Sequence, residues 1–227
     1  MDPVWLPPRA PLWFPPVDEA DDEGLLAVGG DLSPQRLLLA YERGIFPWYE
    51  EGLPPLWWSP DPRTVITAES LHVSRSLART IRSGRFTVTL DRAFGDVIRG
   101  CREGREDATW LFGEMVDAYE LLHRLGDAHS VEVWQGERLV GGLYGVQRGA
   151  LFAAESMFHR VSDASKVAVV AAVRSFFAAG IQVFDVQMTT DHLLSMGAAE
   201  WPRAVYVRAV AGAVRRPVTL TVGLGSD

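Results

Sequence analysis

The sequence contains almost no cysteine and almost no lysine. Its single cysteine, Cys101, excludes an internal disulfide, and its five histidines show no metal-ligand spacing, so a structural zinc site is not expected. No apolar run is long enough to span a bilayer, and residues 1–16 lack the charged-then-apolar layout of a signal peptide. These absences predict a soluble cytoplasmic protein without a metal.

A net charge of −7 argues, by itself, against a nucleic-acid partner. The charge is unevenly distributed, however, because residues 71–86 contain no acid and carry Arg75, Arg79, Arg82 and Arg85. Helical spacing puts the first three on one face, where guanidinium groups can bind successive phosphates without reading a base sequence. The segment is therefore a candidate nucleic-acid contact, although similar patches also occur in proteins without such a partner.

Residues 24–63 are rich in aromatic side chains and proline. Within them, Ser33 is a good N-cap, Pro34 suits the first helical position and Gly44 is a typical C-terminal stop, which predicts a helix over Ser33–Arg43. Two rigid aromatic segments follow, Phe46–Tyr49 and Leu56–Arg63, with little regular structure expected around them. They either cover a small core or present a binding surface for a flat ligand.

The second half of the chain alternates between predicted strands and one apolar helix. Strands are expected at Ser130–Trp134, Leu139–Val146 and Ala150–Met157, then a buried helix over Ser165–Ala179, and a strand over Val183–Gln187. Antiparallel strands followed by a helical crossover to another strand resemble the fold of the N-acyltransferases that use acyl coenzyme A (GNAT-like). We therefore expect an α/β (α+β) protein.

Several motifs follow one another in a specific order along the chain. They are GGDLSPQRLLLAYERGIFPWY and PPLWWSPDPR, then HVSRSL (72–77), HSVEVW (129–134), GGLYGV (141–146), ESMF (155–158), SDASK (162–166), and FDVQ with DH (184–192). Over nearly its whole length the chain resembles the leucyl/phenylalanyl-tRNA protein transferases of bacteria. The expected organisation is a small aromatic and proline-rich N-terminal domain, residues 1–62, and an acyltransferase-like catalytic domain, residues 63–227.

The resemblance implies an aminoacyltransferase. It would move leucine or phenylalanine, and methionine to a lesser degree, from leucyl-tRNA or phenylalanyl-tRNA to proteins with N-terminal Arg or Lys, in the N-degron degradation pathway. Because the acyl ester is already activated, the reaction needs positioning, proton removal and charge stabilisation, and no cofactor is expected. The protein is expected to act as a monomer.

Three polar residues are the candidate catalytic groups. Strand alternation puts Asp185 and Gln187 on one face, and by resemblance they occupy the positions used for proton removal and for orienting the amine. In an alternative, the terminal ribose hydroxyl of the tRNA moves the proton and Asp185 holds the cationic peptide. Glu155 is an acid in an apolar strand, which requires a cation, either the substrate ammonium or Arg160 or Lys166.

The resemblance also implies binding residues. Trp48 and Trp110 would flank the terminal adenosine of the tRNA, and the four arginines would contact its backbone. The pocket for the leucine or phenylalanine side chain would be formed by Leu143, Phe152, Met157, Val169, Ala172 and Phe184.

Two other functions remain as alternatives: a coenzyme A-dependent acetyltransferase and a noncatalytic RNA-binding or peptide-binding module. Against the first, His159–Lys166 contains no glycine, so its backbone amides are poorly suited to cradle a pyrophosphate. Lys166, the only lysine, is a candidate for a mobile positive charge near a carboxylate or phosphate. His192, after Asp191, is the one histidine retained as a candidate site residue.

Overall fold

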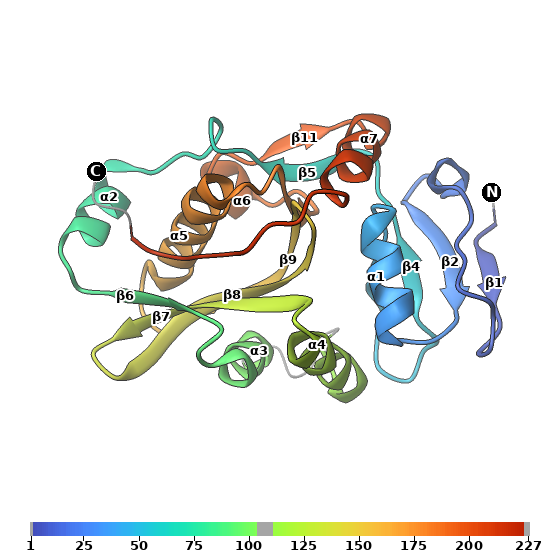
Figure 1. The fold of residues 1–227 in the computed structure, drawn as a ribbon, viewed down its shortest axis with the longest axis horizontal. Helices are drawn as coiled ribbons and strands as arrows, with labels where there is room; N and C mark the ends of the chain where they lie inside the picture. Colours follow the sequence, from blue (N-terminus) through green and yellow to red (C-terminus); the bar gives the residue numbers. More distant parts are fainter. Residues whose placement is uncertain (1, 104–110, 225–227) are drawn as a thin grey trace.

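The computed structural model describes residues 2–103 and 111–224. A small sheet at the N-terminal end has the strand order β1-β2-β4-β3 (Figure 1). Its strands and helices are β1 (Val4–Leu6), η1 (Val17–Glu19), β2 (Leu25–Gly29), α1 (Pro34–Glu42), β3 (Phe46–Pro47) and β4 (Leu56–Trp58). Trp57 is fully buried and its indole N–H donates to the carbonyl of Gly29 at 2.8 Å, so this aromatic side chain belongs to the core.

The helix α1 begins and ends as its sequence predicts. The Ser33 hydroxyl accepts the backbone N–H of Arg36, and Pro34 is the first helical residue, where its missing N–H needs no partner. Gly44 follows the helix with φ +76°, a conformation that favours glycine. The helix prediction is confirmed to within one residue at each end.

The larger sheet has seven strands in the order β11-β5-β10-β9-β8-β7-β6. Its strands are β5 (Arg63–Ile66), β6 (Thr87–Leu90), β7 (Ala128–Gln135), β8 (Arg138–Arg148), β9 (Leu151–His159), β10 (Val183–Gln187) and β11 (Ala199–Trp201). All neighbours are antiparallel except β9 and β10, which are parallel and are joined by a helical crossover. The predicted antiparallel strands and the crossover are therefore present.

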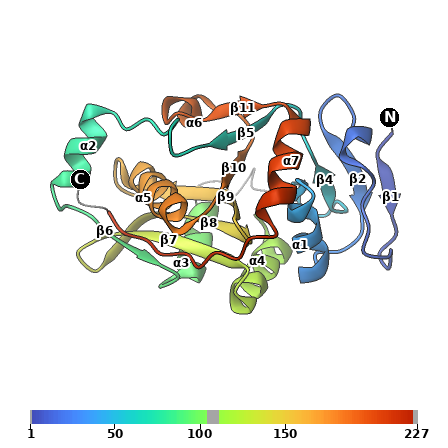
Figure 2. The same cartoon turned by 45° about the horizontal axis from the view of Figure 1, so that its top comes forward.

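Helices cover both faces of the larger sheet, with α5 on one face and α3 and α4 on the other (Figures 1 and 2). The helices are α2 (Arg75–Arg82), α3 (Phe94–Arg102), α4 (Gly113–Leu125), α5 (Ala164–Ala179), α6 (Asp191–Ser195) and α7 (Arg203–Ala213). After α7, the chain runs extended across α5, and Ser175 exchanges hydrogen bonds with the backbone of Gly223. Covered by the sheet and this segment, α5 is mostly buried, as its apolar sequence predicts.

The two sheets are packed together through one continuous hydrophobic core. Side chains of α1 meet α4 and the ends of β8 and β9, and the hydroxyls of Tyr41 and Tyr119 lie 2.8 Å apart across this contact. Arg148 of β8 also pairs with Glu42 of α1 and with Asp127. The N-terminal sheet is thus fixed against the larger one, which gives the site next to β9 rigid walls on this side.

The mixed α and β class is confirmed. The small sheet ends at Trp58 and the large one starts at Arg63, while the boundary at residues 62 and 63 and the GNAT-like assignment stay predictions. In the part of the chain that the structure describes, no helix has the length and apolar character needed to cross a membrane.

Candidate active site

A cavity of about 470 Å³ opens where β9 and β10 stop pairing. The parallel register runs only from Val183 opposite Leu151 to Asp185 opposite Ala153. Past this point β9 and β10 line the cavity together with β8, α5 and α6. Its lining residues are Leu143, Ala154, Glu155, Ser156, Met157, His159, Ser165, Val169, Phe184, Val186, Gln187, Thr190, His192 and Leu193.

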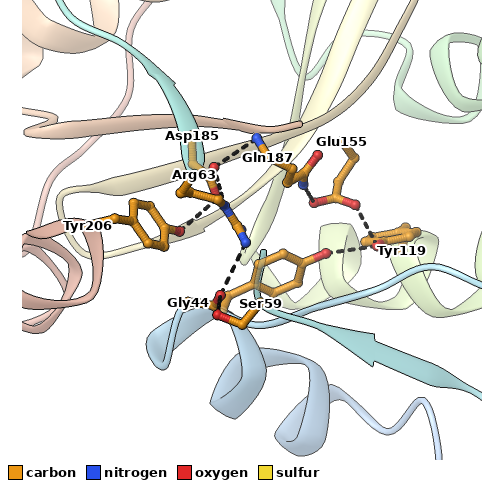
Figure 3. Close-up of polar contacts among 9 residues, drawn as sticks. Gly44, Ser59, Arg63, Tyr119, Glu155, Asp185, Gln187 and Tyr206 are labelled. Atoms are coloured by element: carbon orange, nitrogen blue, oxygen red, sulfur yellow. Dashed lines mark hydrogen bonds and ion pairs between the residues drawn. The ribbon is translucent and has the colours of Figure 1, made fainter. Parts of the chain in front are cut away.

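Glu155 is the extra residue of a β-bulge in β9. Opposite it, Tyr144 pairs with Ser156 and Gly145 pairs with Ala154, so Glu155 has no partner in the ladder. Its carboxylate accepts the Gln187 side-chain N–H at 2.7 Å and the Tyr119 hydroxyl at 2.8 Å (Figure 3). The bulge therefore directs an acid toward the cavity in an otherwise apolar strand.

The Glu155 carboxyl group has a raised pKa. Burial raises its pKa to about 7, and the nearby Asp185 charge adds to the rise, against hydroxyl donors that favour the charged form. Of the two protein cations considered for this acid, Arg160 is paired with Glu103, and Lys166 makes no ion pair among the described residues. Glu155 is thus poised to exchange a proton near neutral pH.

Gln187 also stands at an irregularity, where the pairing of β10 with β5 shifts between Asp185 and Gln187. Its φ of +61° lies in the left-handed region, which costs free energy for a residue with a side chain. Strict alternation would put Gln187 opposite to Phe184 and Val186, yet all three line the cavity. The prediction that Asp185 and Gln187 present their side chains together is therefore wrong, because the bulge breaks the alternation.

Asp185 is fully buried and is not part of the cavity wall. Its carboxylate accepts two N–H groups of Arg63, at 2.9 and 2.7 Å, the Tyr206 hydroxyl at 2.7 Å and the Gln187 backbone N–H at 2.9 Å. These four donors fill its acceptor sites. Asp185 therefore has no direct access to the cavity, and its two predicted roles, as the proton acceptor and as the group that holds the peptide, stay predictions.

Arg63, which sequence reasoning missed, is the cation of this buried pair. Its guanidinium lies 4.6 and 4.7 Å from the ring centroids of Phe46 and Tyr206. It also donates to the Gly44 carbonyl (Figure 3). Burial acts to lower the Arg63 pKa, but the interactions with Asp185, Tyr206 and Glu155 together outweigh it and the pKa is raised. The sequence feature that could have identified Arg63 is its position at the start of the otherwise apolar strand RTVI.

A second missed group is the tyrosine pair behind Glu155. Tyr41 and Tyr119 are both buried, and burial together with the Glu155 charge raises the pKa of each hydroxyl. Both hydroxyls therefore remain protonated near neutral pH and can donate. The polar contacts form a chain from the Arg63–Asp185 pair through Gln187 and Glu155 to these tyrosines.

The structure divides the residues predicted for the side-chain pocket into two groups. Leu143, Met157, Val169 and Phe184 line the cavity, as the prediction requires. Phe152 and Ala172 do not: both are fully buried, and Phe152 packs against Phe176 and Phe184. Their predicted place in the wall is corrected, because they form the core directly behind it.

The predicted RNA contacts that belong to the described residues do not line the cavity. Trp48 is 41% exposed with its ring 5.9 Å from that of Trp58, and Trp110 lies outside the described residues. Arg75, Arg79 and Arg82 are exposed on α2, and Arg85 follows the helix with its guanidinium over Phe86. Their contact with RNA stays a prediction.

Polar groups gather at the part of the cavity formed by α5 and α6. His159 and Ser165 approach each other at 3.4 Å, and His192 lines the same cavity. Partial burial, then the positive charges of Lys166 and His159, lower the His192 pKa. Across the two described stretches, no three His, Cys, Asp or Glu side chains come together as a candidate metal site.

Comparisons with known proteins agree over both parts of the chain. Residues 65–211 match the family described as leucyl/phenylalanyl-tRNA protein transferase, and residues 30–61 match the N-terminal domain of that family. The chain is 57% identical over 208 residues to a leucyl/phenylalanyl-tRNA–protein transferase of Anaeromyxobacter sp. (strain Fw109-5), covering 90% of this chain and 88% of the relative. It is 54% identical to the enzyme of that name from Stutzerimonas stutzeri (strain A1501), covering 94% and 96%.

Proposed function

Because the chain belongs to the leucyl/phenylalanyl-tRNA protein transferase family, we propose that it transfers leucine or phenylalanine from aminoacyl-tRNA to the N-terminal Arg or Lys of proteins. Methionine is transferred to a lesser degree, and the modified proteins enter the N-degron pathway. The enzyme works as a cytoplasmic monomer without a cofactor. The observation that carries this proposal is the Glu155 carboxylate, which forms no ion pair among the described residues, beside the Gln187 amide in a partly apolar cavity.

The donor side chain occupies the apolar part of the cavity. Leu143, Met157, Val169 and Phe184 supply an apolar surface for a leucine or phenylalanine side chain. Each methylene that fits or fails to fit in such a pocket changes the free energy by about 1–3 kcal/mol. The pocket therefore selects large apolar aminoacyl groups.

The incoming amine is the cation that Glu155 lacks. An N-terminal amine has a pKa of about 7.7 to 8.0, so it arrives largely as an ammonium near pH 7. A carboxylate with a pKa of about 7 can take up its proton, and the Gln187 carbonyl oxygen, whose amide N–H is held by Glu155, can accept from the same amine. Glu155 is therefore the base in this proposal and Gln187 the orienting group.

The neutral amine then attacks the ester carbonyl. A nitrogen–carbon bond forms, and the bond between the carbonyl carbon and the ribose oxygen of the tRNA breaks. The first proton of the ammonium goes to Glu155, while the second proton leaves the nitrogen after attack and ends on the departing ribose oxygen. Asp185 acts on this step indirectly, because it holds the strained backbone of Gln187 and the Arg63 guanidinium.

Transfer of a radiolabel tests the proposal. The protein is mixed with labelled leucyl-tRNA and with peptides that begin with Arg or with Ala, without ATP. We expect label on the Arg peptide only. No label on the Arg peptide would refute the proposed function, and label transferred from acetyl coenzyme A instead would favour the acetyltransferase.

A further inference from the structure

Three cationic or proton-binding side chains from three different elements come close enough at one end of the cavity for two of them to act electrostatically on the third. His159 comes from the end of β9, Lys166 from the first turn of α5 and His192 from α6. His159 and His192 line the cavity, and so does Ser165, which precedes Lys166. These three side chains, with Ser165, are called the cationic rim.

The cationic rim is not neutralised by the protein. In residues 2–103 and 111–224, neither histidine nor Lys166 has a carboxylate within ion-pair distance, whereas Arg36, Arg63, Arg148 and Arg160 each have one. The acid nearest to Lys166 in the sequence, Asp163, accepts the Thr80 hydroxyl at 3.1 Å. The positive charge of Lys166 also depresses the His192 pKa, as expected of neighbouring like charges. Among the described residues, no carboxylate therefore forms an ion pair with the cationic rim.

The rim also connects the cavity with the arginines of α2. The hydrogen bond from Thr80 to Asp163 joins α2 to the residue just before α5, and the two helices lie side by side (Figure 2). Arg79 and Arg82 flank Thr80 in the same helix and are exposed. The hydrogen bond thus places the first turn of α5, which carries Lys166, next to the helix that carries these arginines.

Phosphate oxygens match the donors of the rim. An ammonium, two imidazoles that can donate N–H groups, and a serine hydroxyl provide charge-assisted and neutral hydrogen bonds to a single anion. We propose that Lys166, together with His159 and His192, binds the last phosphate of the donor RNA strand, at the 5′ oxygen of the terminal adenosine. This inference rests on the proposed function, and it makes Lys166 a residue that positions the donor.

Two stable donor analogues test the inference. Both carry phenylalanine on the 3′ nitrogen of 3′-amino-3′-deoxyadenosine through an amide, and they differ only in a 5′-hydroxyl or a 5′-phosphate. Each is measured as an inhibitor of leucyl transfer from leucyl-tRNA to an Arg peptide. In the unmodified protein we expect the 5′-phosphate to lower the inhibition constant about tenfold, the effect of one charge-assisted hydrogen bond.

Variants assign that advantage to the rim. Lys166→Gln removes the charge from a half-exposed position and should reduce the advantage to less than about twofold, while inhibition by the 5′-hydroxyl analogue stays unchanged. Lys166→Arg should retain most of the advantage. Arg208→Gln, which removes one exposed charge from α7, is the matched control and should retain all of it.

The outcomes separate this inference from the proposed function. No phosphate advantage in the unmodified protein, a full advantage in Lys166→Gln, or an equal loss for both analogues would each overturn the inference while leucyl transfer still stands. Absence of leucyl transfer by the unmodified protein would refute the proposed function itself.

Discussion

Asp185 and Glu155 are carboxylates on neighbouring strands of one sheet, but their surroundings are opposite. Asp185 is fully buried, paired with Arg63 and supplied with four donors. Glu155 lies in β9, two residues after the residue that pairs with Asp185. It faces a cavity, and its carboxylate accepts hydrogen bonds from an amide and a tyrosine hydroxyl. The surroundings of Asp185 suit a structural role. Those of Glu155 leave its carboxyl group able to exchange a proton. Environment, and not residue type, assigns the two roles.

The largest expected effect is on activity when Glu155 can no longer accept a proton. Glu155→Gln keeps the size of the side chain, so we expect folding to be retained and the rate of leucyl transfer to fall about 10²–10⁴-fold, the usual contribution of a general base. Steady-state transfer to an Arg peptide measures this. Glu69→Gln, a change of the same kind at an exposed position, is the control. A fall of less than fivefold would mean that Glu155 is not the base.

Breaking the Arg63–Asp185 pair should mainly lower stability. Asp185→Ala leaves a buried guanidinium without its partner, which costs about 3–5 kcal/mol of unfolding free energy. Urea denaturation measures the loss, and the exposed change Glu69→Ala should stay within about 0.5 kcal/mol. If Asp185→Ala lowers the unfolding free energy by less than 1 kcal/mol, the ion pair does not hold this part of the sheet.

The ionisation of Glu155 predicts a dependence of stability on pH. The Glu155 pKa is about 7 in the folded protein and 4.5 in the reference state, so the folded state holds the proton more tightly. Its contribution is fully present below about pH 4.5 and is lost as the pH rises through about 7, by roughly 3 kcal/mol. The unfolding free energy of the unmodified protein minus that of Glu155→Gln should fall over this range. A flat difference would mean that the Glu155 pKa is ordinary.

The smallest expected effect is a pKa shift within the cationic rim of the same cavity. Because the Lys166 charge lowers the His192 pKa, Lys166→Gln should raise this pKa toward its ordinary value. NMR titration of the His192 ring protons detects the shift, and Arg208→Gln should cause none. An unchanged His192 pKa in Lys166→Gln would show that the two side chains do not interact. It would then count against a common anion site formed by the cationic rim.

Local chemistry made part of this molecule predictable from sequence. The cap, proline and glycine around α1 act within a few residues, and the apolar circumference of α5 directly reports its burial. Glu155 was identified because an acid in an apolar strand needs an explanation. These features depend on neighbours in the chain, which a sequence displays.

Other parts of the site depend on distant or irregular contacts. Arg63 meets Asp185 across 122 residues, so neither residue reveals its partner. The shifts at Glu155 and Gln187 break the alternation on which strand reasoning relies, so the prediction put Gln187 on the wrong face, together with Asp185. Phe152 and Ala172 look like pocket residues, but only the packing of α5 on the sheet decides which apolar side chains reach the cavity.

The dependence of kcat/KM on pH for leucyl transfer tests the central claim that Glu155, and not Asp185, takes the proton. The unmodified protein should show a rise with an inflection near pH 7, in addition to the ionisation of the acceptor amine. Glu155→Gln should lose that inflection, and Asp185→Asn should keep it at a lower pH, because the Asp185 charge raises the Glu155 pKa. An inflection near pH 7 that survives in Glu155→Gln and disappears in Asp185→Asn would contradict the claim.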